Sequence, residues 1–186
     1  DLIGHKDENE AVTLANAALW RNPATGVMFD ASKDWNGIVY VHMANANDGG
    51  AVRLINGASI PDRPTDAQGQ DAGFTLATNA PAYIQGNYNA DGVISNDASK
   101  IRDPEPGEAP AAVIADAITI LSNSWDDAKS NSGLGSRKAS QTEVAAAIVT
   151  GIVPTNYKNN GTYSGGVENL PRFLGDWDGV KFGYRG

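Results

Sequence analysis

The hydrophobic positions near the start of the chain recur at helical spacing. Val12, Ala15 and Leu19 lie three to four residues apart, with acidic residues before them, and this spacing places them on one face of an α-helix. Acidic residues favour a helix N-terminus, and Pro23 ends the pattern because proline cannot continue a helix. The pattern predicts one helix within an N-terminal segment, residues 1–24.

Beyond this segment the hydrophobic positions form short runs separated by polar, glycine-rich or proline-rich stretches. Most runs are rich in Val, Ile, Thr, Phe or Tyr, which favour strands, and they are too short for helices of ordinary length. The predicted strands lie within residues 37–43, 51–55, 73–78, 81–86, 111–121, 144–153 and 180–184. The chain is therefore predicted to be mainly β, with one domain over residues 25–186.

The connections between these runs are long and irregular. Antiparallel hairpins prefer loops of roughly 2–5 residues, and only residues 55–59 look like such a turn. Short strands joined by loops of irregular length favour a parallel β-solenoid, in which each coil adds one strand to each face. Because no fixed repeat period is present, a β-sandwich remains the alternative.

Asparagine recurs near the ends of the predicted strands. This residue tolerates the left-handed backbone conformation and can stack in ladders between successive coils. The positions are Asn56, Asn87, Asn123 and Asn156. They fit the corners that a solenoid needs.

Composition limits the function. The 186 residues include 22 acidic and 14 basic side chains, a net charge of −8, which disfavours binding to nucleic acid or anionic membranes. The chain has no cysteine, which excludes disulfides, thiolate metal sites and a cysteine nucleophile. No apolar run approaches the ~18 residues of a membrane span, and the first residues resemble no signal peptide. We expect a soluble chain that is a mature or trimmed product of something longer.

Residues 86–97, GNYNADGVISND, resemble the start of a calcium-binding loop. Asn87, Asn89 and Asp91 stand at positions 1, 3 and 5, where such loops place oxygen ligands, and glycine follows at position 6. Position 12 should be a bidentate Glu but is Ala98, with Asp97 one residue earlier. We interpret the segment as a structural turn, and we expect the protein to have no cofactor. The alternative is a Ca²⁺ site formed by Asn87, Asn89, Asp91 and Asp97.

Carboxylates offer a second kind of site. Asp116 lies inside the apolar run VIADAITIL, and Asp126 and Asp127 follow the next turn. Paired carboxylates cleave glycosidic bonds, and a carboxyl group in an apolar setting can act as a general acid. We interpret Asp116 as structural, because spacing along the chain cannot supply the required geometry. A β-helix enzyme that cleaves polysaccharides is the alternative.

Other catalytic patterns are weak. The two histidines, His5 and His42, cannot form a typical zinc site without cysteine or carboxylate help, and we interpret His42 as an ordinary strand residue. Ser164 follows Gly161 by three residues, whereas a nucleophile elbow requires two. The glycines of residues 133–138, GLGSRK, lack the spacing of a phosphate-binding loop.

Aromatic residues gather in or near the predicted loops. They can stack on sugar rings or pack in interfaces, but large aromatic side chains are usually mostly buried. We therefore interpret Trp125 and Trp177 as structural. Leu170, Phe173, Leu174 and Trp177 recur at helical spacing around Pro171, which predicts a short helix from about residue 169 that caps the fold and shields strand edges. Tyr157, Tyr163 and Tyr184 complete the aromatic set.

Several of these stretches occur together and in this order in one bacterial family. The chain from about residue 37 to its end resembles the C-terminal region of PilX-type pilus assembly proteins and related prepilin-like proteins. The most specific blocks are IADAITILSNSW and GGVENLPRFLGDW, and the others are 73–89, 145–155 and 181–186. The resemblance implies an exported, surface-associated protein with a β-helix-like domain and no assigned catalytic residues.

Together these observations predict a non-enzymatic structural or adhesive module. Its place would be the cell surface or the extracellular space, as part of a pilus-associated protein. The expected partners are pilus or other surface-filament subunits, with a glycan or another surface ligand as a further partner. Self-assembly through open solenoid ends, and a calcium-stabilised matrix module, are alternatives.

Overall fold

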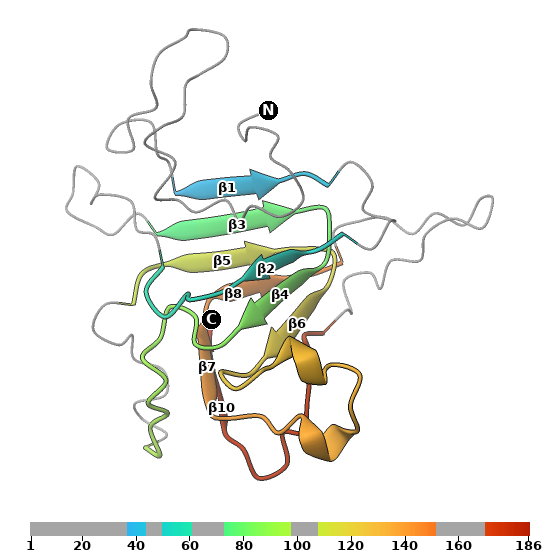
Figure 1. Ribbon diagram of the computed structural model, residues 1–186. Coiled ribbons are helices and arrows are strands. Elements are labelled where there is room, and N and C mark those ends of the chain that lie inside the picture. The colour runs from blue at the N-terminus through green and yellow to red at the C-terminus, as the bar shows by residue number, and fades with distance from the viewer. Residues whose placement is uncertain (1–36, 44–49, 61–72, 98–107, 152–169) are drawn as a thin grey trace, which may run out of the picture.

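A computed structural model describes residues 37–43, 50–60, 73–97, 108–151 and 170–186 (Figure 1). The predicted N-terminal helix lies outside these residues, as do His5, Ala98, Asn156, Tyr157, Tyr163 and Ser164. The described residues contain strands and two short 3-10 helices, η3 (Asp127–Lys129) and η4 (Leu134–Ser136). No helix in this part of the chain has the length and hydrophobicity needed to span a bilayer. The protein is mainly β, as the short apolar runs predict.

The strands form three parallel sheets. The first sheet has the order β1-β3-β5-β8, the second β2-β4-β6-β9, and the third pairs β10 with β7. Every one of these ladders is parallel, whereas the sheets of a β-sandwich are antiparallel. The strands are β1 (Ile38–Val41), β2 (Val52–Leu54), β3 (Phe74–Thr78), β4 (Ala82–Gln85), β5 (Ala111–Ile114), β6 (Ile118–Leu121), β7 (Thr142–Ala145), β8 (Ala147–Val149), β9 (Arg172–Leu174) and β10 (Phe182–Arg185).

The chain visits these sheets in a repeated order. Strands β1, β3 and β5 of the first sheet are each followed by a strand of the second, β2, β4 and β6, and the series β8, β9, β10 then passes through all three sheets. Tyr88, after β4, bridges to Val144 of β7 in parallel, so the third sheet also has a contact to the segment that follows β4. Figure 1 shows the strands of the first sheet stacked one below another.

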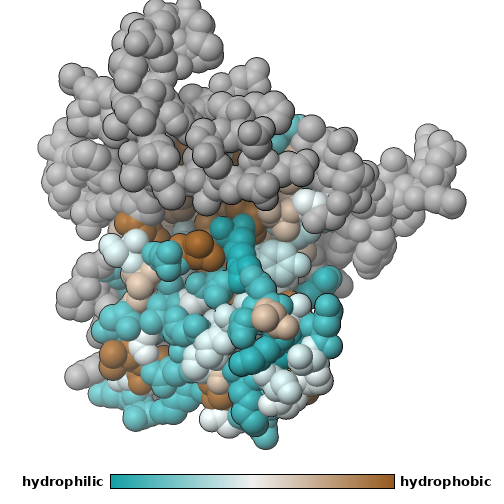
Figure 2. All heavy atoms as spheres, viewed as in Figure 1, coloured by the Kyte–Doolittle hydropathy of each residue, from teal (hydrophilic) through white to brown (hydrophobic). Residues whose placement is uncertain are grey.

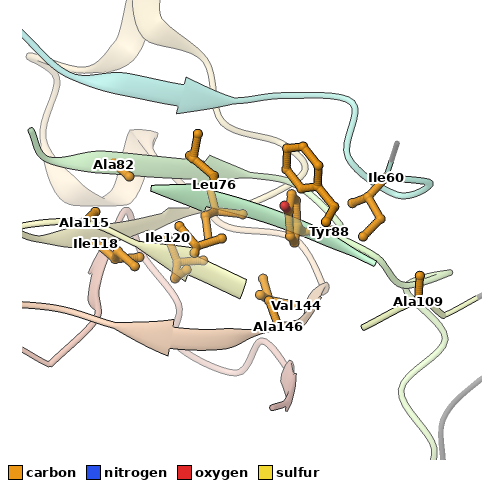
Figure 3. Packing of buried hydrophobic residues seen from close by; sticks show 13 residues of the cluster. Ile60, Leu76, Ala82, Tyr88, Ala109, Ala115, Ile118, Ile120, Val144 and Ala146 are labelled. Carbon is orange, nitrogen blue, oxygen red and sulfur yellow. The ribbon is translucent and has the colours of Figure 1, made fainter. Parts of the chain in front are cut away.

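The core lies between the three sheets. Alternate residues of the strands in the first sheet point inward, and Val39, Leu76, Val113 and Ile148 align across its four strands. Ile84 and Ile120 align in the second sheet and are fully buried. Figure 3 shows Leu76 and Ile120 of this core together with Val144 of the third sheet. Burying each such aliphatic side chain stabilises the fold by about 1.5–3 kcal/mol.

The corners between strands use the predicted asparagines. Asn56 has a left-handed backbone, with φ 56°. The Asn123 amide donates to Asn87 Oδ1 at 2.8 Å, and the Asn87 backbone N–H donates to Asn123 Oδ1 at 3.0 Å. Gly86 precedes this pair with φ +77°, and a Cβ there would lie 2.6 Å from Asn123 Oδ1. The predicted asparagine stacking is confirmed at this corner.

Three predicted elements differ in the structure. The run 144–153 is divided, since its first residues end β7 (Thr142–Ala145) and Ala147–Val149 forms β8 in the first sheet. The run 111–121 is divided into β5 and β6, because the chain turns from the first sheet to the second at residues 115–117. The predicted helix around Pro171 is wrong, since Arg172–Leu174 forms strand β9 beside β6. There the backbone joins a sheet ladder, and this long-range pairing overrides the helical spacing of the side chains.

Candidate functional site

A pocket lies in the loop between β6 and β7. Its volume is about 150 Å³, and its lining is polar and charged except for one indole ring: Ser124, Trp125, Asp126, Lys129, Ser136, Arg137 and Lys138. Figure 2 shows mainly hydrophilic side chains over the lower part of the described molecule, where Figure 1 places β6 and this loop. We take this pocket, the Trp125 pocket, as the candidate functional site.

Local hydrogen bonds shape the loop. The Asp126 side chain accepts from the Ala128 backbone N–H at 3.0 Å and so caps η3, as short acidic side chains do at helix starts. Lys129, at the other end of η3, lies 3.5 Å from the Asp126 carboxylate. Arg137 follows η4, and its backbone N–H donates to Leu134 O at 2.9 Å. The two 3-10 turns therefore place Trp125 and Arg137 on the same pocket.

The segment between β9 and β10 supports the loop. The Asp176 backbone N–H donates to Arg137 O, and Asp176 O accepts from Ala139 N–H, both at 2.8 Å. Lys138 Nζ lies 3.2 Å from Asp176 Oδ2. Gly175 has φ +103°, and a Cβ there would lie 2.8 Å from Arg137 O, so this close approach of the two backbones requires glycine. The pocket thus depends on strands far apart in the sequence.

Trp125 is held by a polar network. Its indole N–H donates to Asp127 Oδ1 at 2.8 Å, and Arg53 Nη1 donates to Asp127 Oδ2 at 2.7 Å. Arg53 also donates to Gln85 Oε1, and the Gln85 amide donates to Trp125 O at 3.4 Å. The hydrogen bonds from Arg53 and Trp125 hold the pKa of Asp127 below its ordinary value. The network fixes the indole through residues of β2 and β4.

Arg137 differs from the other cations of the pocket. Lys129 and Lys138 pair with carboxylates, whereas no carboxylate of the described residues forms an ion pair with Arg137. Its Nη1 donates to Ser130 O at 3.4 Å. Its Nε is buried and has no hydrogen-bond partner in the described structure. An unsatisfied buried donor is unfavourable, and the burial of Nε leaves the terminal nitrogens of the guanidinium to contact an acceptor in the pocket.

The residues of the predicted calcium loop take part in hydrogen bonds within the protein. Asn87 Oδ1 accepts from Asn123 and from the Glu143 backbone N–H. Asn89 is buried with φ 52°, and its Oδ1 accepts from the Ala109 N–H at 3.0 Å. Asp91 Oδ1 accepts from the Val93 N–H at 2.7 Å, two residues on, which is turn geometry.

The exposed Asp97 completes this set, and its backbone N–H donates to Ser95 Oγ at 3.1 Å. No group of three or more His, Cys, Asp or Glu side chains that could hold a metal ion occurs within the described residues. The contacts favour the turn interpretation, and the Ca²⁺ site remains a prediction.

The other single residues lie in separate places. Half-buried Asp116 sits at the turn between β5 and β6, where its backbone N–H donates to Ala80 O and its carbonyl accepts from Gly151 N–H. It does not line the Trp125 pocket, whereas Asp126 does. His42 is exposed just after β1 and stacks near Tyr40, with ring centroids 6.3 Å apart.

Aromatic residues also meet at the last strands. Phe173 packs edge to face against Trp177 and Phe182, with centroid distances of 5.3 Å and 4.8 Å. The Trp177 indole N–H donates to Leu174 O at 2.9 Å. Pro171 and Trp177 are half-buried, while Phe173 and Tyr184 remain 45% and 46% exposed. The cluster packs against the core through Trp177 and Phe182, beside the segment where a capping helix was predicted.

Sequence reasoning missed a buried ionic cluster. Arg185 Nη1 lies 2.6 Å from Glu143 Oε1, and Arg185 Nε lies 3.0 Å from Glu108 Oε2. Glu143 is only 2% exposed. The one signal for it in the sequence is a glutamate placed directly before the apolar run VAAAIV. Arg137 was likewise missed, because its significance depends on Trp125, twelve residues earlier.

The comparisons with known proteins add no relative. No family model, no curated protein and no solved structure matches the chain.

Proposed function

We propose that the chain is a parallel β-solenoid module with a structural or adhesive role in an exported, pilus-associated surface protein. The observation that carries this proposal is the repeated passage of the chain through the same parallel sheets in register. Such stacking of successive strands makes a rigid body with an extended surface. The resemblance to PilX-type proteins supplies the pilus association.

The chemistry of the Trp125 pocket supports binding rather than catalysis. A glycosidase needs one carboxyl group that stays protonated near neutral pH. Asp126 caps η3 and pairs with Lys129, while Asp127 accepts hydrogen bonds from Arg53 and Trp125 that lower its pKa. The hydrogen bonds to Asp127 stabilise its charged form, which suits a recognition surface.

The net charge of the chain also limits which classes of partner it can bind. A net charge of −8 disfavours nucleic acid and the surface of anionic membranes as partners. Filament subunits and glycans remain as partners of this module.

Localisation tests the proposal. Surface filaments would be sheared from the producing cells, purified, and analysed for this protein by mass spectrometry, with a cytoplasmic protein and cells lacking filaments as controls. We expect the protein in the filament fraction, and its loss when filaments are absent. Recovery only from the culture medium would overturn the pilus association and favour a free secreted enzyme or matrix protein.

A further inference from the structure

We propose that the Trp125 pocket binds a sugar residue that bears a carboxylate, as one unit of an acidic glycan. This inference rests on the proposed adhesive function, because it names the ligand class of the same module. Three features of the pocket support this inference. They are the free hydrogen-bonding capacity of Arg137, the fixed orientation of the Trp125 indole, and the small volume and polar lining of the pocket.

Arg137 provides the binding group for a carboxylate. Its Nη1 donates to Ser130 O, its Nε is buried, and its Nη2 makes no hydrogen bond within the described residues. The two terminal nitrogens of a guanidinium can donate parallel hydrogen bonds to a carboxylate. The neighbouring Lys129 and Lys138 are occupied by Asp126 and Asp176 at 3.5 Å and 3.2 Å. The pocket therefore offers one guanidinium to one anionic group.

Trp125 provides the surface for a sugar ring. Its side chain lines the pocket and is oriented by the hydrogen bond from the indole N–H to Asp127. Sugar rings pack on aromatic faces, and an aromatic side chain that is already ordered loses little entropy on binding. A simple anion site would not need this indole, so the combination of Trp125 with Arg137 favours a sugar acid over an inorganic anion.

The size and the hydroxyl lining set the extent of the ligand. The volume of about 150 Å³ is below the ~300–1,000 Å³ of sites for drug-sized ligands, so the pocket takes one residue and leaves the remaining glycan in solvent. Ser124 and Ser136 line the same pocket and supply hydroxyls that can donate to or accept from sugar hydroxyls. Ser124 is fixed by its hydrogen bond to Lys138 O at 2.9 Å.

The test compares matched ligands by titration calorimetry. The probes are a galacturonic acid trimer, a neutral galactose trimer, and succinate as a carboxylate without a sugar ring. We expect the acidic trimer to bind about tenfold or more tightly than either control. Equal binding of the neutral trimer, or equal binding of succinate, would overturn the proposed ligand class. No binding of the acidic trimer would overturn the site.

Two substitutions locate the binding group. Arg137→Met should weaken binding of the acidic trimer about tenfold, and Arg137→Lys should also weaken it, because lysine keeps the charge but loses the planar fork. Arg172→Met is the control, an exposed arginine on β9 outside the pocket. Unchanged binding in Arg137→Lys, with an unchanged circular dichroism spectrum, would overturn the role of Arg137.

The outcomes separate this inference from the proposed function. Specific binding by a protein that is absent from filaments would contradict the pilus association and leave the sugar-acid site standing. A filament-associated protein that binds none of the probes would contradict this inference alone.

Discussion

Replacing Arg185 with methionine would remove the guanidinium that lies between Glu108 and Glu143. The two contacts measure 3.0 Å and 2.6 Å, and the exposed fractions of the side chains are 9% for Arg185, 15% for Glu108 and 2% for Glu143. Methionine keeps much of the volume of arginine and removes the charge. In the variant, the mostly buried carboxylates of Glu108 and Glu143 would lose this cation.

The expected loss is large because the pair is buried. Breaking a buried ion pair by removing one partner costs about 3–5 kcal/mol, against a total stability of about 5–15 kcal/mol for a typical domain. An exposed pair contributes about 0–1 kcal/mol. Arg53 and Asp127 form such a pair, with side chains 34% and 68% exposed. Arg53→Met is therefore the matched control.

Urea unfolding followed by circular dichroism measures the difference. We expect the midpoint of Arg185→Met to fall by an amount equivalent to about 3–5 kcal/mol, with an unchanged slope against urea. The double variant Glu143→Gln/Arg185→Met should recover part of the loss, because it no longer buries the charge of Glu143. If Arg185→Met lowers the free energy of unfolding by less than about 1 kcal/mol, as Arg53→Met is expected to do, burial does not strengthen this ion pair and the reasoning is refuted.

Three further predictions concern single groups. Tyr88 is buried in the core, and its hydroxyl has no hydrogen-bond partner in the described structure, so Tyr88→Phe should be neutral or stabilising by about 1 kcal/mol; destabilisation by more than that in urea would show a hidden partner. The pKa of Asp127 lies below the ordinary 3.8, so its contribution is complete above that pH and is lost as the pH falls through the folded pKa. In Asp127→Asn, the free energy of unfolding should therefore fall less steeply as the pH drops below 3.8. The same dependence on pH in the variant and the unmodified protein would contradict this prediction. Because the amide oxygens of Asn87 and Asn89 already accept hydrogen bonds, millimolar Ca²⁺ should leave the melting temperature unchanged; a rise that a chelator reverses would establish the calcium site.

Local sequence pattern predicts the positions of half of the strands among the described residues. Short runs rich in β-branched and aromatic residues correspond to β1, β2, β3, β4 and β10, because alternation along a strand records which side chains face the core. It also identified corners, since Asn56 adopts the left-handed conformation and Asn87 stacks with Asn123. Backbone tolerance and face alternation are properties of a residue and its near neighbours, so they can be read from the chain.

The pairing of the strands and the contacts between distant polar groups depend on the tertiary structure. Residues 172–174 form β9 because their backbone can complete a ladder with β6, although their side-chain spacing also suits a helix. The Trp125 pocket needs the backbone of Gly175 against Arg137, and the buried cluster needs Arg185 beside Glu143, 42 residues away in the chain. Such contacts depend on the register of the whole set of parallel sheets, which no local pattern encodes.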